Sequence, residues 1–182
     1  MESMSTDLAW ILTGCCWLRE ARLYLDKPVP DEVVFRVLEA GRPAGSAKNG
    51  QPWEFILVRD RERLEKLSRY GQFASHLPNA SFAVVIVVSD RYIQDRFDAG
   101  RAEQNRMLAA HFLGVGSCPI TFHDEEGAKA FLKIPKELRI AVCIAFGYSA
   151  EGRPRGCSGK RLRRYSTSRS MVAATPELPE PS

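Results

Sequence analysis

The chain has no long hydrophobic segment. Its longest clearly apolar run, residues 82–88, is far too short to cross a bilayer. No basic stretch precedes the apolar residues near the N-terminus, so a secretory signal peptide is not expected. We therefore expect a cytoplasmic protein that does not work on a membrane.

Patterns that would indicate a disulfide framework, a metal site or a nucleotide-binding loop are also missing. The five cysteines form no C-x-x-C pair, and their odd number and scattered spacing are typical of reduced thiols in a cytoplasm. The three histidines lie far apart, so no metal site is expected. The chain has no Gly-x-Gly-x-x-Gly motif, and residues 156–160 lack the spacing of a Walker motif.

The composition is that of an ordinary globular protein. The 182 residues are 45% apolar and 26% charged, which is compatible with one domain. The net charge of +4 fits a site for an anionic cofactor and does not by itself indicate nucleic acid. We predict a single domain over residues 1–165, followed by a tail at 166–182 that has no core-forming pattern and is expected to be disordered.

Hydrophobic periodicity predicts helices interleaved with strands. Helices are expected at residues 7–24, 31–40, 60–70, 93–113 and 124–133, and strands at 53–59, 82–89 and 139–148. Residues 114–119 are interpreted as a turn that follows a helix C-cap at Gly114. The pattern indicates an α+β or α/β sandwich, in which the long helix at 93–113 is a central helix or a dimer interface.

The most informative stretch is residues 45–58, where a polar loop runs directly into an apolar strand. Small residues in the loop allow a ligand to approach the backbone closely. Ser46, Asn49 and Gln51 offer hydrogen-bond donors and acceptors suited to a flat heteroaromatic ring. Pro52 fixes the entry into the strand, and Trp53 can anchor that strand in the core.

This stretch resembles the Pro-Ser-x-x-Asn-x-Gln-Pro-Trp signature of the nitroreductase superfamily, with Gly45 in place of the first proline. Other segments resemble the family in the same order along the chain. They are the basic segment 18–24, the long helix around 98–110, the Gly-Val-Gly-Ser-Cys sequence at 114–118, and the segments at 131–135 and 145–151. Together the similar segments span roughly residues 18–165.

The resemblance implies an α+β fold, a three-layer α/β/α sandwich with a central mixed or antiparallel sheet and a long central helix. It also implies a homodimer with FMN at the subunit interface. Such proteins take hydride from NAD(P)H and pass it to a small-molecule substrate, here expected to be a nitroaromatic, a quinone or a similar planar, electron-poor compound. Because the flavin carries the chemistry, no catalytic side chain is expected.

The resemblance also assigns residues to parts of the cofactor. Four basic residues are expected to hold the phosphate: Arg19, Arg22, Lys160 and Arg161. Polar side chains are expected beside the ribityl chain and the ring: Ser46, Asn49, Gln51 and Gln72. The backbone of residues 119–122 is expected near flavin N5, which adds Pro119, Ile120 and Thr121 to the site.

The chain departs from the family pattern at two positions. Leu18 stands where the family usually has arginine, and Glu20 stands where a serine commonly contacts the phosphate. The carboxylate of Glu20 would repel a phosphate unless it turns away or pairs with a nearby arginine. An alternative function is therefore a protein of this fold that binds flavin weakly or not at all, with a ligand-sequestering or assembly role.

Other interpretations also stay open at this stage. A specialised family member would be a dehalogenase, a flavin-fragmenting enzyme or a biosynthetic dehydrogenase. Arg19 and Arg22 are alternatively solvated charges, and the polar loop is alternatively an ordinary turn that Gln51 braces. The basic segment at 153–169 could contact RNA, although no aromatic residues are interleaved with it beyond Tyr165.

Overall fold

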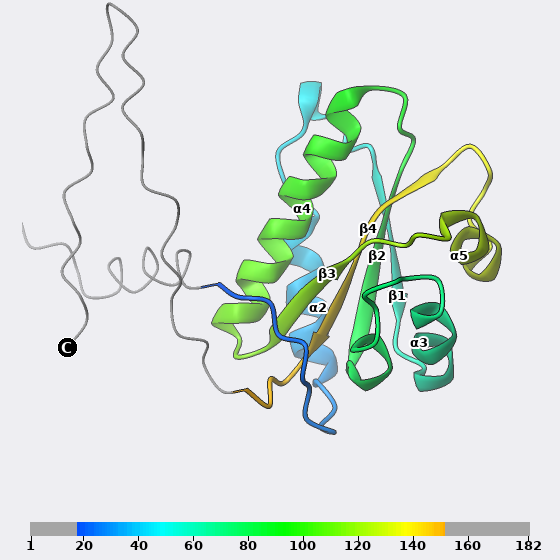
Figure 1. Ribbon diagram of the computed structural model, residues 1–182. Helices are drawn as coiled ribbons and strands as arrows, with labels where there is room; N and C mark the ends of the chain where they lie inside the picture. The colour runs from blue at the N-terminus through cyan, green and yellow to red at the C-terminus, as the bar shows by residue number, and fades with distance from the viewer. Residues whose placement is uncertain (1–17, 152–182) are drawn as a thin grey trace, which may run out of the picture.

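A computed structural model describes residues 18–151, in which a four-stranded sheet lies between two layers of helices (Figure 1). The strands are β1 (Trp53–Val58), β2 (Phe82–Val88), β3 (Gly116–Ile120) and β4 (Arg139–Gly147). Their order across the sheet is β1-β2-β4-β3, and each neighbouring pair is antiparallel. The expected α+β sandwich is confirmed, and its central sheet is antiparallel.

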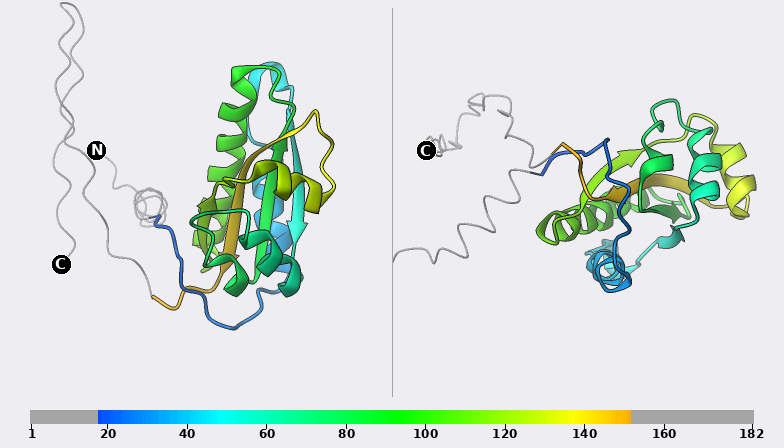
Figure 2. Two further views of the ribbon diagram at one scale, coloured as in Figure 1. Left: turned by 45° about the vertical axis from the view of Figure 1, so that its right-hand side comes forward. Right: turned by 90° about the horizontal axis from the view of Figure 1, so that it is seen from below.

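The helices divide between the two faces of this sheet (Figure 2). Helices α2 (Asp31–Gly41) and α4 (Ile93–Phe112) pack together on one face. Helices α3 (Arg61–Ser68) and α5 (Glu125–Leu132) cover the other face, with the short 3₁₀ helix η2 (Leu77–Asn79) beside α3. A second 3₁₀ helix, η1 (Ala47–Asn49), lies in the loop between α2 and β1.

Strand β2 explains why two separate cores form. All seven of its residues are buried, as its β-branched run predicts. Alternate side chains point to opposite faces of a strand. Val84 and Ile86 therefore join the core under α2 and α4, whereas Val85 and Val87 join the core under α3 and α5.

Two predictions about local structure are wrong. Residues 18–24 are not the end of a helix, because this segment runs extended and forms single bridges from Glu20 to Ser117 and from Tyr24 to Ser149. Residues 116–120 are a strand rather than part of a turn. In both cases pairing with a distant segment overrides the local preference, which is helical at residues 18–24 and against a strand at 116–120, where glycine and proline disfavour one.

Several expectations fall on residues that the structure does not describe. They are the first part of the expected helix at 7–24, the domain boundary at residue 165 and the tail at 166–182. Within residues 18–151, no helix is both long enough and apolar enough to cross a membrane.

Candidate functional site

The loop between α2 and β1, residues 41–51, holds the backbone in an unusual conformation. Lys48, Asn49 and Gln51 all have positive φ values, of 53°, 55° and 44°. Left-handed conformations are costly for residues other than glycine and persist only where the surroundings fix them. Such local strain tends to mark functional sites, so the loop is the first candidate for one.

Hydrogen bonds inside the 41–51 loop fix its polar side chains. The backbone N–H of Gln51 donates to Ser46 Oγ at 2.9 Å, and the Gln51 side-chain amide donates to Asn49 Oδ1 at 3.1 Å. The backbone N–H of Asn49 donates to the carbonyl of Ser46 at 3.0 Å. The structure thus brings Ser46, Asn49 and Gln51 together, and Gln51 also braces the loop.

A cavity of about 570 Å³ separates the 41–51 loop from the start of α4. Lys48 and Gly50 line it from the loop, and Arg91, Tyr92 and Gln94 line it from the other side. Its volume lies in the range of small-molecule sites. Polar loop groups and an aromatic side chain therefore border a space large enough for a planar ligand.

The N-terminal segment, residues 18–25, lies at the other end of α4 along the edge of β3. The backbone N–H of Ala21 donates to the carbonyl of Ser117 at 2.9 Å, which fixes the segment there. Arg22 forms an ion pair with Glu20 at 3.5 Å, and both side chains are about half exposed. Glu20 thus has the nearby arginine partner that would moderate its repulsion of a phosphate.

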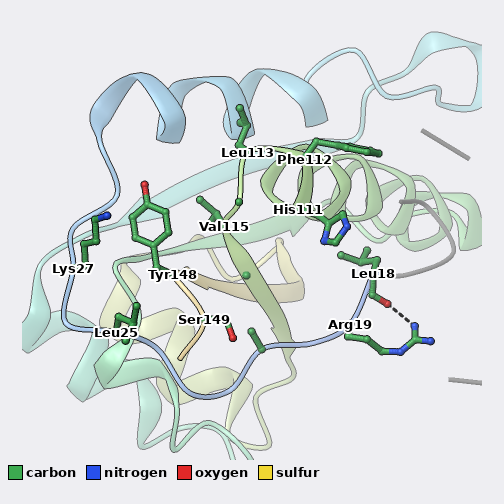
Figure 3. Close-up of a pocket in the computed structure, with 13 residues that line it drawn as sticks. Leu18, Arg19, Leu25, Lys27, His111, Phe112, Leu113, Val115, Tyr148 and Ser149 are labelled. Carbon is green, nitrogen blue, oxygen red and sulfur yellow. Dashed lines mark hydrogen bonds between the residues drawn. The ribbon is translucent and has the colours of Figure 1, made fainter. Parts of the chain in front are cut away.

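A second cavity, of about 550 Å³, lies beside this segment and the end of α4 (Figure 3). Leu18, Arg19 and His111 lie on one side of it, and Lys27 and Tyr148 lie on the opposite side. Arg19 lines this cavity, whereas Arg22 pairs with Glu20, as expected where side chains alternate along an extended segment. Lys160 and Arg161 lie outside the described residues.

The predicted site residues are therefore divided between distant parts of the molecule. The 41–51 loop precedes β1 at one edge of the sheet, and the N-terminal segment pairs with β3 at the opposite edge (Figure 1). The two cavities adjoin opposite ends of α4, whose 20 residues span about 30 Å. One protomer does not bring Arg22 and Asn49 to a common small-molecule site.

The sequence and the fold were both compared with those of known proteins. A sequence model of the nitroreductase family matches residues 19–77 and 74–148, which together make up most of the chain. The chain belongs to the nitroreductase family.

Similar nitroreductases cover most of the chain. A protein of Archaeoglobus fulgidus named as an NADH dehydrogenase/NAD(P)H nitroreductase is 39% identical over 139 residues, which cover 71% of this chain and 80% of that protein. An FMN-dependent nitroreductase from Clostridium difficile has a TM-score of 0.76 and 30% identity, over 82% of this chain and 94% of the other. A nitroreductase from Desulfovibrio desulfuricans, solved in complex with FMN, has a TM-score of 0.72 and 30% identity, over 84% and 91% of the two chains.

The end of β3 in this nitroreductase lies close to Gln72. A Cβ placed on the neighbouring Gly71 would lie 3.4 Å from both Ile120 Cγ2 and the Thr121 carbonyl oxygen. Pro119 has no N–H, and edge strands such as β3 tolerate proline where that group would face away from the sheet. Of the four predicted residues at this edge, only Gln72, Ile120 and Thr121 can therefore offer a backbone donor.

A buried histidine lies behind this edge. His76 is buried, and its ring centroid lies 6.4 Å from that of Tyr24. Burial, reinforced by the charge of Arg22, lowers the pKa of His76. Burial also raises the pKa of the Cys118 thiol, which disfavours a reactive thiolate there. His76 is therefore a neutral core histidine near the edge of the candidate site.

Two residues of this nitroreductase carry interactions that its sequence did not reveal. Asp98, in α4, accepts a hydrogen bond from the backbone N–H of Ala47 at 2.8 Å. Arg106, also in α4, is fully buried with its guanidinium 3.6 Å from the centroid of the Phe55 ring. A charged residue within an otherwise apolar helical stripe was the signal available for both positions.

Proposed function

We propose that this nitroreductase-family protein is an FMN-dependent oxidoreductase that takes hydride from NAD(P)H. Its acceptor would be a nitroaromatic, a quinone or a similar planar, electron-poor small molecule. The observation that carries the proposal is the strained 41–51 loop of a chain of this family: it brings Ser46, Asn49 and Gln51 together, and the intervening Lys48 and Gly50 line a cavity. The names of its relatives agree with this activity.

The residues present fit the chemistry of FMN. The ring and ribityl chain need amide and hydroxyl partners, which Ser46, Asn49 and Gln51 supply. The phosphate needs guanidinium or ammonium groups. Arg22 would supply one of them from the side of the segment that carries Glu20, and Arg19 would have to reach the phosphate from the opposite side. Bound FMN would supply the redox chemistry, so the side chains named here bind and orient it rather than act as acid or base.

The edge of β3 would contribute a backbone donor. Ser117 offers its carbonyl to the N-terminal segment, away from β4. Backbone groups of alternate residues point to the same side of a strand. By this alternation, the backbone groups of Pro119 and Thr121 also face away from β4. The missing N–H of Pro119 therefore breaks no hydrogen bond to β4. The Thr121 N–H is the donor we assign to the negative charge of reduced flavin.

A complete flavin site would need two copies of the chain. This proposal is supported by the separation of Arg22 from Asn49 along α4, because a second copy could bring its own 41–51 loop to the first copy's N-terminal segment. The exposed face of α4 also carries large apolar side chains: Ile93 is 86% exposed and Phe97 is 70% exposed. A Cβ added to Gly100 would meet nothing within 4 Å, which leaves room for a second backbone to approach.

The homodimer would work in the cytoplasm, a location supported by the cysteine pattern. Cys118 and Cys143 are both free and buried. No nucleic acid or membrane takes part in this proposed function.

The decisive experiment is an absorbance spectrum of the purified, untagged protein, followed by identification of the cofactor released on denaturation. Flavin absorbance with released FMN, bleached by NADPH or NADH without oxygen, is expected. Comparing the two donors at equal concentration would reveal the preferred one. A colourless protein that also takes up no added FMN would contradict the proposal.

One observation favours a second function. The Glu20–Arg22 pair places a carboxylate beside the arginine that a phosphate would need. If the protein binds no FMN but gains affinity on Glu20→Ser, it is a nitroreductase scaffold with a ligand-sequestering or assembly role. If it already binds FMN tightly, this alternative is excluded.

A further inference from the structure

The 41–51 loop is tied to α4 by a single buried carboxylate. Asp98 is only 3% exposed, and its Oδ2 accepts the Ala47 N–H at 2.8 Å across 51 residues of sequence. Its other oxygen, Oδ1, faces Arg101 at 3.4 Å. Burying a carboxylate is costly unless it is paired and hydrogen-bonded, so this contact fixes the loop in one position.

The position of this contact within the loop matters. Ala47 directly follows Ser46 and directly precedes Lys48, the first of the positive-φ residues. The other hydrogen bonds of the loop are internal, so they set its shape but not its place on the fold. The hydrogen bond from Ala47 to Asp98 instead joins the middle of the loop directly to α4.

The neighbouring Gly45 supports the same conclusion. A Cβ at Gly45 would overlap the guanidinium of Arg101, the ion-pair partner of Asp98. The start of the loop therefore lies directly against the Asp98–Arg101 pair. Any larger residue at position 45 would have to displace Arg101 from it.

We propose that Asp98 is a positioning residue, which holds Ser46, Asn49 and Gln51 at the place where the flavin ring and ribityl chain bind. The expected effect on flavin binding rests on the proposed FMN function, whereas the contact between Asp98 and Ala47 does not. Asp98 also lines the cavity beside the loop, but its two carboxylate oxygens face Ala47 and Arg101, so we assign it to the loop backbone rather than to the ligand. Its removal would therefore weaken FMN and riboflavin by the same factor, because the two flavins differ only at the phosphate.

Helix α4 provides a matched control one turn earlier. Asp95 is similarly buried, but its Oδ2 accepts hydrogen bonds from Ser89 Oγ at 2.8 Å and from the backbone N–H of Arg91 at 3.0 Å. These bonds cap the start of α4 and do not reach the 41–51 loop. Asp95→Asn makes the same change of charge as Asp98→Asn on the same helix, and it leaves the hydrogen bond between Ala47 and Asp98 in place.

The first test uses the flavin-free protein and amide hydrogen exchange read over residues 45–51. Asp98→Ala is expected to speed exchange there by about tenfold, equal to about 1.4 kcal/mol. Asp98→Asn keeps an acceptor oxygen and should show a smaller increase, which provides a readout if the alanine variant does not fold. Asp95→Asn should leave these amides unchanged. Unchanged exchange in both Asp98 variants would overturn the inference.

The second test measures dissociation constants by flavin fluorescence. Asp98→Ala is expected to weaken FMN and riboflavin alike by about tenfold, and Asp98→Asn should weaken both less. If the wild type binds FMN and Asp98→Ala binds it equally well, the positioning role is overturned. If the wild type binds no flavin, the proposed function fails, and the exchange measurement alone decides whether Asp98 holds the loop.

Discussion

The two ends of α4 are built differently. At its N-terminal end, buried Asp95 and Asp98 accept short hydrogen bonds from backbone N–H groups of the adjoining segments. At its C-terminal end, the N-terminal segment lies against β3 and carries an exposed ion pair, Glu20 with Arg22, at 3.5 Å. One end uses buried charges with fixed partners, and the other uses charges in contact with solvent.

This difference indicates that the two parts of the proposed flavin site differ in rigidity. Buried, fully paired polar groups specify one geometry, whereas exposed ion pairs contribute little and rearrange easily. The 41–51 loop is therefore preorganised for a ring within a single chain. The phosphate end is adjustable, and its strength depends on Glu20 and on what a second copy adds.

The largest expected effect comes from the exposed face of α4. There, the 41–51 loop of one copy would meet the N-terminal segment of the other. Phe97→Asp places a charge at a position that is 70% exposed in the single chain. If this face is a subunit interface, burial of that charge is costly and the dimer dissociates. Analytical ultracentrifugation should then show a monomer, and FMN binding should be lost because each site would contain only one end.

Phe35→Asp is the matched control for this variant. Phe35 is also an exposed aromatic residue on a helix, but it lies on α2 rather than α4. It should leave the dimer and the bound flavin intact. A wild type that is already monomeric and yet binds FMN would contradict the two-copy site.

A smaller effect is expected at Arg106, which supports both flanks of the 41–51 loop. Its guanidinium donates to the Leu38 carbonyl at 3.3 Å, stacks on Phe55 and fills the space above Gly41. Arg106→Ala would leave a cavity and is expected to lower the free energy of unfolding by about 3 kcal/mol. Urea unfolding of the flavin-free protein measures this loss.

Arg106→Met separates packing from charge at the same position. Burial lowers the pKa of Arg106 to about 10, so the site makes its charged form costlier than in water, although that form still predominates at pH 7. Methionine keeps much of the volume and removes the charge, and a loss below about 1 kcal/mol is expected. An equal loss in the two variants would show that the hydrogen bond to Leu38, rather than packing, stabilises this position.

The sequence predicted what depends on local pattern. The helices α2 to α5 and the buried strand β2 were predicted within a few residues, and the polar loop was correctly placed between a helix and a strand. Spacing of apolar residues carries that information, because burial on one face repeats along a regular element.

What depends on distant pairing could not be predicted in this way. Strand β3 contains glycine, serine and proline and is a strand only because β4 pairs with it. Residues 18–24 have a helical pattern but extend along β3. The contact between Asp98 and Ala47 spans 51 residues; the helical pattern can mark Asp98 as a charge on a buried stripe, but it does not indicate the partner.

The adjustable phosphate end gives the third prediction. Glu20→Ser removes a carboxylate that competes with phosphate for Arg22, so FMN affinity should rise by about tenfold. Riboflavin lacks the phosphate and should bind as before. Glu32→Ser removes another exposed carboxylate, paired with Arg36 on α2, and should change neither affinity. A parallel rise for both flavins would mean that Glu20 acts on the fold rather than on the phosphate.

The smallest effects are expected at two ion pairs, Arg139 with Glu125 and Arg22 with Glu20. Arg139 donates two hydrogen bonds to Glu125, at 2.8 and 2.6 Å, and these lower the pKa of Glu125. A carboxyl with a lowered folded pKa stabilises the fold above its unfolded pKa, and that stability is lost as the pH falls through the folded value. Glu125→Gln should therefore cost about 1 kcal/mol at pH 7, and this cost should shrink below about pH 4.5. Urea unfolding at pH 7 and below about pH 4.5 measures this cost.

Glu20→Gln should change the free energy of unfolding by less than about 0.5 kcal/mol at pH 7. Equal losses at the two positions would contradict the view that the exposed Glu20–Arg22 pair contributes little to the fold.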